Sequence, residues 1–404
     1  MTERGVDVAI VGGGIMGASL AWRLARRGAG RVALFERSVV ASGASGKTGG
    51  LLRRHYSNRT EATLAQRGWR VYSDWPEIVG GDPVHTPAGL IVTVDTSPAC
   101  PSNLDRLRRN VAMQNELGIP ARVVSPAELA DLQPFACWDD VAAAAYEPDS
   151  GYVDAVAATR GMALAARRAG ADVREATPVL GVAVEGERVV GVRTRFGVVP
   201  AGAVVAAAGP WTNRVLAGTG VSLPIEALRV QVAVVHRPLA LEAPHLVYLD
   251  TANGVFARAW GPGRTFLGVA AGEQHDVVDP DAYDQRSEPE HGERAIAALA
   301  RRIPAMKDAV YLTGQTGLYD MTPDAHAIIG PAGPDGLFVM AGFSGAGFKK
   351  GPAVGEAMAD LLLDGRCDWV DLAPFHLDRF ADDSWRRPWS DTEYAFPADF
   401  GHGL

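Results

Sequence analysis

The glycine-rich segment Gly12-Gly13-Gly14-Ile15-Met16-Gly17 has the residue types and spacing of a phosphate-binding turn. Gly12 permits a sharp turn, Gly14 leaves room for a pyrophosphate against the backbone, and Gly17 lets a helix pack closely on a strand. Free N–H groups at the start of the following helix, together with the helix dipole, attract the phosphates. The spacing therefore predicts a nucleotide site, although similar glycine turns also occur for structural reasons alone.

Two apolar segments place this turn in a longer pattern. Val8-Ala9-Ile10-Val11 precedes the turn, an alanine-rich helical stretch over 18–27 follows it, and Val32-Ala33-Leu34-Phe35 then ends at Glu36. An acid at that position accepts hydrogen bonds from the adenosine ribose hydroxyls and disfavours a 2′-phosphate. The order of strand, turn, helix, strand and acid therefore favours a dinucleotide other than NADP over a purely structural turn.

Length and composition narrow the class of protein. A chain of 404 residues exceeds one ordinary core, so we expect two interlocked domains. The net charge of −8 argues against a nucleic-acid partner. Cys100, Cys137 and Cys367 are odd in number and lack CxxC spacing, which indicates neither a disulfide framework nor a metal site. With no signal-peptide pattern and no membrane span, we expect a cytoplasmic protein.

The nucleotide-type signals lie near the start, the middle and the end of the chain, with strand-rich stretches between them. We therefore expect an α/β fold with a Rossmann-like domain assembled from three segments, and an inserted β-rich α+β substrate domain. The expected bounds are 1–82, 140–214 and 312–380 for the first domain, 83–139 and 215–311 for the second, and 381–404 for a tail. Helices are predicted over 18–27, 60–75, 104–117, 155–168, 289–302 and 352–363, and a buried strand over 203–208.

Four segments together give the sequence a family resemblance. They are IVGGGIMG with Glu36, ASGASGKTGGLLRRHYS, GLYDMTPDAHAIIGP and GFSGAGFKKGPAVGE. By these motifs, residues 6–380 resemble the FAD-dependent amino-acid and amine oxidoreductases, which include D-amino-acid oxidase, glycine oxidase and sarcosine oxidase. The sarcosine oxidase branch is the most similar. For the small-residue stretch 38–50, we favour a loop pressed against a ligand over a flexible linker, because an ordered pattern resumes directly after it at 51–56.

The resemblance implies FAD, with Val179 at the adenine and the turn at Gly345 beside the isoalloxazine ring. Gly351-Pro352 is expected to begin a helix whose positive end favours the reduced flavin. Covalent relatives carry a cysteine where this chain has Gly317, so we expect noncovalent FAD. The expected cofactor contacts are Gly12, Gly14, Ile15, Met16, Gly17, Glu36, Arg37, Ser45, Gly46, Thr48, Gly49, Gly50, Leu51, Pro178, Val179, Ala208, Gly209, Trp211, Gly317, Gly342, Phe343, Gly345, Ala346, Gly347, Phe348 and Lys349.

The same resemblance implies that Arg53 and Lys349 bind a substrate carboxylate, for which a guanidinium fork and an ammonium charge are suited. Surface positions are the alternative for both, and the neighbouring Arg54 is expected to be the more exposed arginine. Tyr319 is expected beside the flavin, or else in the core. His55 is a candidate near the site, although a lone histidine is usually structural.

These residues predict oxidation of a C–N bond in a small amino acid or N-alkyl amino acid, with hydride transfer to flavin N5 and hydrolysis of the imine. Oxygen or another acceptor would reoxidise the flavin. Phe266 stands where oxidase relatives place an oxygen-activating lysine, which raises the odds of a dehydrogenase. Two alternatives remain open: a 2-hydroxy-acid dehydrogenase with His55 as the base, and a flavin subunit that needs a partner chain.

The tail, 381–404, lies beyond the resemblance and is rich in aromatic residues, among them Trp385, Trp389, Tyr394 and Phe400. Disordered tails are poor in such residues, so we expect the tail to be docked in an extended form. It could pack on its own chain, form the contact of a homo-oligomer, or cover the substrate entrance.

Overall fold

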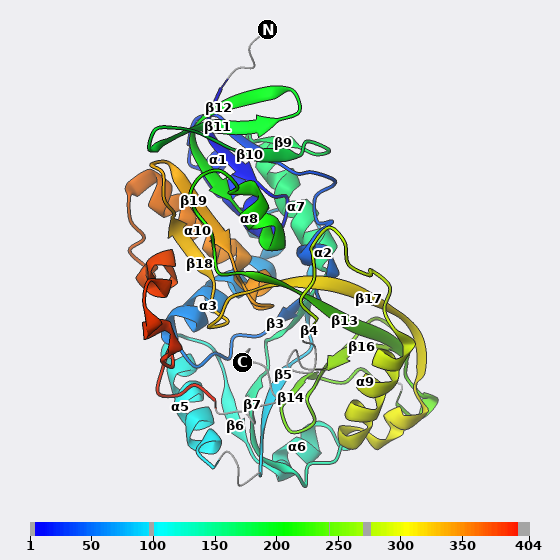
Figure 1. Ribbon diagram of the computed structural model, residues 1–404. Coiled ribbons are helices and arrows are strands. Elements are labelled where there is room, and N and C mark those ends of the chain that lie inside the picture. The colour runs from blue at the N-terminus through cyan, green and yellow to red at the C-terminus, as the bar shows by residue number, and fades with distance from the viewer. Residues whose placement is uncertain (1–4, 97–100, 242, 270–275, 395–404) are drawn as a thin grey trace.

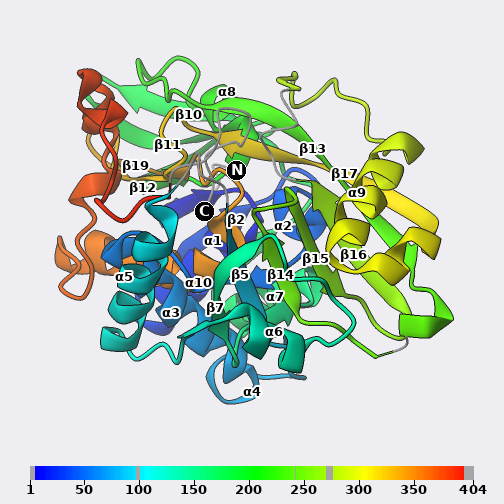
Figure 2. The same ribbon diagram turned by 90° about the horizontal axis from the view of Figure 1, so that it is seen from below.

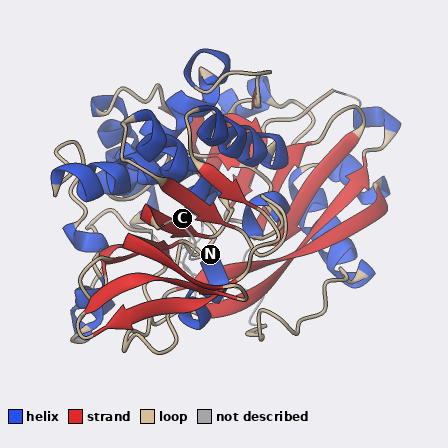
Figure 3. Ribbon diagram, turned by 90° about the horizontal axis from the view of Figure 1, so that it is seen from above, coloured by secondary structure: helices blue, strands red, loops and turns tan. Residues whose placement is uncertain are grey.

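The structure is a computed structural model that describes residues 5–96, 101–241, 243–269 and 276–394. Two sheets organise these residues (Figure 1), and long strands occupy the middle of the molecule with helices at its periphery (Figure 3). Within the described residues, no helix is both long and apolar enough to cross a membrane. The same residues contain no group of metal-binding side chains.

The first sheet is centred on β1 (Val6–Val11), the strand before the glycine turn. β1 pairs in parallel with β2 (Val32–Phe35) on one side and with β12 (Gly197–Ala206) on the other. The predicted buried run is the end of β12, where Val204, Val205 and Ala206 are fully buried between neighbouring strands. The sheet continues through β9 (Asp172–Arg174), β19 (Leu337–Ala341) and β18 (Ile328–Pro331).

Helices cover one face of this sheet and a strand meander covers the other. α1 (Ile15–Arg26), α7 (Ala155–Arg168) and α10 (Gly347–Asp364) pack on the first face through apolar side chains. β10 (Val179–Glu185) and β11 (Arg188–Thr194) pack with the start of β12 on the second. The glycine turn therefore lies where the carboxyl end of β1 meets the amino end of α1, as the sequence predicted.

The second sheet is mostly antiparallel and carries helices at both ends, α5 (Asn103–Glu116) at one and α9 (Pro289–Arg302) at the other (Figures 1 and 2). α6 (Pro126–Leu132) packs below it. Its strands, in spatial order, are β17 (Val310–Met321), β13 (Glu226–His236), β16 (Arg264–Val269), β15 (Val255–Ala259), β14 (Val247–Asp250), β5 (Leu90–Asp95), β7 (Val141–Glu147) and β6 (Arg122–Val124). β7 and β17 thus belong to this sheet. The domain boundaries expected from the sequence, at residues 140 and 312, instead place β7 and most of β17 in the Rossmann-like domain.

A small sheet of β3 (Leu51–Leu52), β8 (Gly151–Val153) and β4 (His85–Pro87) joins the two halves. The preceding small-residue stretch contains a short helix, α2 (Ala44–Lys47). The helix predicted over 60–75 is present as α3 (Arg59–Ser73), and a division at Asp74 separates it from a short following helix, α4 (Trp75–Ile78). Pro76 explains the division, because a proline lacks the N–H of the helical ladder and clashes with the preceding turn.

Candidate active site

A long cavity of about 630 Å³ extends from the glycine turn and Glu36 to the start of α10. It lies at the carboxyl ends of parallel strands, which is where open α/β sheets bind ligands. Seventeen of the predicted cofactor residues line it: Gly12, Gly14, Ile15, Met16, Glu36, Arg37, Ser45, Thr48, Pro178, Val179, Ala208, Gly209, Trp211, Phe343, Gly345, Gly347 and Phe348.

The glycine turn is as tight as the motif predicts. Gly12 has a φ of +117°, and a Cβ there would lie 2.3 Å from the carbonyl oxygen of Ala207. A Cβ on Gly17 would lie 2.0 Å from the carbonyl oxygen of Gly12, so this residue allows the close packing of α1 on the turn. The Ile15 N–H donates to Ser45 Oγ at 3.0 Å, which ties the small-residue stretch to the start of α1.

Glu36 is fixed at the wall of the long cavity by two backbone donors. Its carboxylate accepts from the N–H of Gly13 at 2.7 Å and from the N–H of Ser38 at 2.8 Å. A Cβ on Gly13 would come within 2.9 Å of the Glu36 side chain, so this middle glycine is also required. The motif pattern did not single out Gly13. The signal that could have found it is Glu36, the acid after β2 that Gly13 contacts. The geometry fits a dinucleotide whose ribose reaches Glu36.

Arg37 and Trp211 form the rim of the same cavity. The Arg37 guanidinium lies 4.0 Å from the centre of the Trp211 ring. Both side chains donate to Asp281, Arg37 at 2.8 Å and Trp211 at 2.7 Å. Sequence reasoning missed Asp281, because it lies in an irregular segment far from every motif.

A second cavity of about 200 Å³ adjoins the first, and several side chains form walls of both. Thr48, Leu318, Tyr319 and Phe348 are among these shared residues. Of the remaining predicted cofactor residues, Gly49, Leu51, Gly317, Ala346 and Lys349 line the second cavity. Gly17, Gly46, Gly50 and Gly342 line neither cavity, and close backbone or side-chain neighbours occupy the space that a Cβ would need.

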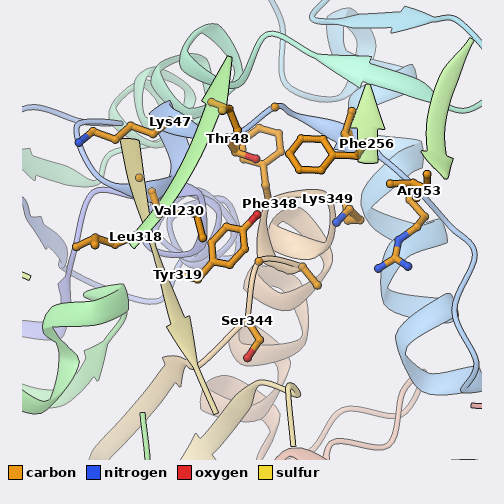
Figure 4. Close-up of a pocket in the computed structure, with 18 of the residues that line it drawn as sticks. Lys47, Thr48, Arg53, Val230, Phe256, Leu318, Tyr319, Ser344, Phe348 and Lys349 are labelled. Atoms are coloured by element: carbon orange, nitrogen blue, oxygen red, sulfur yellow. The ribbon is translucent and has the colours of Figure 1, made fainter. Parts of the chain in front are cut away.

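Arg53 and Lys349 both line the second cavity, and their charged ends lie near each other in Figure 4. They are 4% and 9% exposed, which contradicts a surface position for either. Burial lowers the pKa of Lys349 to about 8, and the neighbouring charges of Arg53 and Lys350 act in the same direction. Two cations therefore converge on one small, mostly apolar space, where a carboxylate would relieve their repulsion.

Tyr56 is a functional candidate that the sequence reasoning missed, although it lies three residues after Arg53 in the same motif. The Arg53 guanidinium lies 4.3 Å from the centre of its ring, and Lys350 Nζ lies 4.8 Å from it. Despite burial, the charges of Lys349, Lys350 and Arg53 lower the pKa of Tyr56. The Tyr56 ring therefore stabilises the charges of Arg53 and Lys350 through cation–π contacts.

Tyr319 lines both cavities and packs against the turn at Gly345, where a Cβ would lie 2.7 Å from the ring. Burial raises the pKa of its hydroxyl. Gly317 also lines the second cavity. Of the cysteines, Cys100 lies outside the described residues, and neither Cys137 nor Cys367 lines either of these two cavities.

His55 is fully buried but lies outside the lining of both cavities. Its Nδ1 bonds Gln114 Oε1 and its Nε2 bonds the Tyr394 hydroxyl, both at 2.6 Å. Burial lowers the pKa of His55 to about 4, so the ring is neutral at physiological pH. The structure thus separates His55 from the cavity that holds Arg53 and Lys349.

Two local expectations are corrected. α10 begins at Gly347 and contains Pro352 in its interior, so the positive helix end lies beside Gly345 and Lys349 is in the first turn. Arg54 is fully buried, because it donates to Ser150 and Gln66 and stacks on Trp69. Phe266 packs near Phe256 and against Gly49, and its place as the counterpart of an oxygen-activating lysine stays a prediction.

Comparison with known proteins confirms the predicted family and fold. A family model described as FAD dependent oxidoreductase matches residues 7–361. The chain is 28% identical to 4-methylaminobutanoate oxidase (formaldehyde-forming) of Paenarthrobacter nicotinovorans, over 89% of this chain and 44% of that protein. It is 29% identical to glycine oxidase of Geobacillus kaustophilus, over 94% and 98%. L-proline dehydrogenase from P. horikoshii has a similar structure, with a TM-score of 0.84 at 26% identity over 94% and 99%.

The chain therefore spans less than half of the first relative but nearly all of the other two. The matched region contains both cavities, from the glycine turn through Lys349. The long cavity has the glycine cradle and the acid that a dinucleotide requires. This chain belongs to the FAD-dependent oxidoreductase family, and its cofactor is FAD.

Proposed function

We propose that this protein oxidises a C–N bond in a small amino acid or N-alkyl amino acid. The observation that carries the proposal is the convergence of Arg53 and Lys349 on the cavity that adjoins the dinucleotide cavity. When bound, FAD supplies the acceptor of the hydride that leaves the carbon next to nitrogen, while the nitrogen releases a proton to water. The imine product then hydrolyses in water.

The relatives support this substrate class by what their names share. Glycine, L-proline and 4-methylaminobutanoate each combine an amine with a carboxylate. In this chain, Arg53 and Lys349 bind the carboxylate, and a cation pair of this kind favours such a group over a neutral one. The small cavity volume, about 200 Å³, favours a compact substrate.

Arg53 and Lys349, together called the carboxylate clamp here, fix the orientation of the substrate. Apolar side chains position the rest of it. Val230, Phe256 and Met321 line the cavity together with Arg53 and Lys349, and Tyr319 stands at its junction with the long cavity (Figure 4). Binding the carboxylate at one end presents the C–H bond next to nitrogen toward the junction. Such positioning lowers the entropic part of the barrier. A substrate amine that binds neutral needs no side-chain base.

The main alternative, oxidation of a 2-hydroxy acid, needs a base for the hydroxyl proton. His55 was the candidate, but its Nε2 accepts from the Tyr394 hydroxyl and the ring lies outside the cavity lining. This arrangement favours the amine substrate. The other alternative is a flavin subunit that turns over only with a partner chain.

An anaerobic flavin-reduction screen separates these functions. The purified single chain, loaded with FAD, would be mixed with D-, L- and N-methyl amino acids and with the matching 2-hydroxy acids. Bleaching of the flavin by an amino acid supports the proposal, and bleaching by hydroxy acids alone contradicts it. A chain that binds FAD but is bleached by none of these compounds supports the partner-dependent subunit.

A further inference from the structure

The described part of the C-terminal tail, residues 381–394, packs on its own chain beside α3 and α5 (Figure 1). Ser390 Oγ and Thr392 Oγ1 both donate to the carbonyl oxygen of Ser57, at 2.8 and 2.7 Å. Asn110 on α5 donates to the carbonyl oxygen of Thr392 at 3.2 Å. No residue of 381–394 lines either cavity, so this part of the tail does not cover the substrate space. Phe396, Pro397 and Phe400 lie outside the described residues.

Tyr394 begins a directed chain of hydrogen bonds that ends beside Arg53. A carboxylate only accepts hydrogen bonds, so the amide nitrogen of Gln114 donates to Glu147 Oε1 at 2.6 Å. The amide oxygen of Gln114, Oε1, is then the acceptor for His55 Nδ1. The other ring nitrogen of His55 then accepts from the Tyr394 hydroxyl at 2.6 Å. Glu147 Oε2 in turn accepts from the backbone N–H of Arg54 at 3.1 Å, which fixes the backbone next to Arg53.

Burial determines the protonation states of Tyr394 and His55 in this chain. Tyr394 is 8% exposed, and burial raises the pKa of its hydroxyl, which therefore keeps its proton and donates it. His55 is neutral for the same reason. The donor and acceptor directions of Tyr394, His55 and Gln114 are thereby fixed, and the chain stabilises one arrangement of the segment between Arg53 and Ser57.

A second set of contacts connects the tail to α10. Trp389 stacks on the His326 ring at 3.7 Å, and Glu393 lies 3.8 Å from His326 Nε2. His326 Nδ1 lies 3.3 Å from Glu61, which also pairs with Lys350 at 2.9 Å. Burial opposes the charge of His326, but Glu393, Glu61 and Asp324 outweigh it and raise the pKa of the ring. This cluster fixes the residue next to Lys349.

We propose that Tyr394 and Glu393 are positioning residues of the carboxylate clamp. They act from the side away from the cavity, Tyr394 through His55 on the Arg53 segment and Glu393 through His326 and Glu61 on the first turn of α10. This inference rests on the proposed function, because it takes Arg53 and Lys349 as the groups that bind the substrate carboxylate. Neither tail residue lines either cavity.

The test compares Tyr394→Phe with the wild type as FAD-loaded full-length protein. The probe is acetate, whose dissociation constant is measured by its perturbation of the flavin absorbance. We expect Tyr394→Phe to weaken acetate binding about 3- to 10-fold, since one buried hydrogen bond is lost. KM for an amino-acid substrate should rise by a similar factor at unchanged kcat, with FAD content and Tm unchanged. Arg386→Ala is the matched control, because Arg386 pairs within the tail with Asp383 and should leave acetate binding unchanged.

Glu393→Gln tests the second set of contacts and also serves if Tyr394→Phe fails to fold. At pH values where His326 is protonated, the Glu393→Gln substitution should weaken acetate binding most, because the charge pair with His326 is lost. As pH rises through the His326 pKa, the acetate dissociation constant of the variant should approach that of the wild type. The inference is overturned if both variants bind acetate as the wild type does while Arg53→Ala loses binding. It is also overturned if affinity falls only in step with FAD content and Tm. The proposed function itself fails, separately, if Arg53→Ala and Lys349→Ala bind acetate normally.

Discussion

Tyr72 donates its hydroxyl proton to the backbone carbonyl of Phe348 at 2.8 Å, inside the core. That carbonyl would accept from the residue four positions later in an uninterrupted helix, but the later residue is Pro352, which has no N–H. A side chain of α3 thus replaces the missing helical donor in the first turns of α10. This turn also carries Lys349, so the bond bears directly on the candidate substrate site.

Tyr72→Phe should lower the free energy of unfolding by about 1–3 kcal/mol, because a buried carbonyl loses its donor. The measurement is a denaturant titration followed by flavin and tryptophan fluorescence. Pro352→Ala restores a backbone N–H at that position, so the cost of Tyr72→Phe should shrink in the Pro352→Ala background. Equal costs in both backgrounds would show that the hydroxyl does not replace the proline's donor.

Arg53→Ala and Lys349→Ala should each lower kcat/KM for carboxylate substrates by roughly 10- to 100-fold. A lost charge-assisted hydrogen bond in a buried site costs about 1.5–3 kcal/mol, which corresponds to that range. Steady-state kinetics with an amino acid and with the amine that lacks its carboxylate provide the comparison. In both variants, kcat/KM for the amino acid should come closer to kcat/KM for the amine. A ratio of these two values equal to that of the wild type would contradict the carboxylate clamp.

Carboxylate binding should weaken as pH rises through about 8, the value to which burial lowers the pKa of Lys349. Below that pH the ammonium is charged and attracts the carboxylate; above it the charge is lost, and affinity should fall by up to about 10-fold per pH unit. Titrations of acetate between pH 6 and 10 would measure this. Lys349→Arg keeps its charge throughout, and its profile should therefore be flat. A wild-type profile without this decline would reject the assignment to Lys349.

The purified protein should be yellow, and the flavin it contains should be FAD, not FMN. Acid denaturation should release this FAD, because Gly317 offers no thiol for covalent attachment. Gly14→Val should abolish FAD binding, since its side chain would enter the pyrophosphate path beside Ser45. Flavin that stays with the precipitated wild-type protein would contradict noncovalent binding. Wild-type FAD content in Gly14→Val would place the pyrophosphate elsewhere.

Local patterns predicted the parts of the site whose causes are local. The glycine turn and Glu36 follow from short-range backbone requirements, and β1, α1 and β2 form as expected because their periodicity is strong. The predicted start of α10 at Pro352 was wrong, because the hydrogen-bond donor that this proline lacks is replaced by Tyr72, 276 positions away from Phe348 in sequence. Similarly, Arg54 is buried through partners that include Ser150 on a distant segment. Such contacts leave no periodic signal in the sequence.

The pairing of Tyr72 with Phe348 also has a consequence for synthesis on the ribosome. At about 5–20 residues per second, the 276 residues between them take roughly 14–55 s to emerge. During that interval the nascent chain carries the complete glycine turn, but α10 and Lys349 have not yet been made. Until α10 is made, the apolar side chains of α1 that pack against it in the folded protein have no partner from that helix.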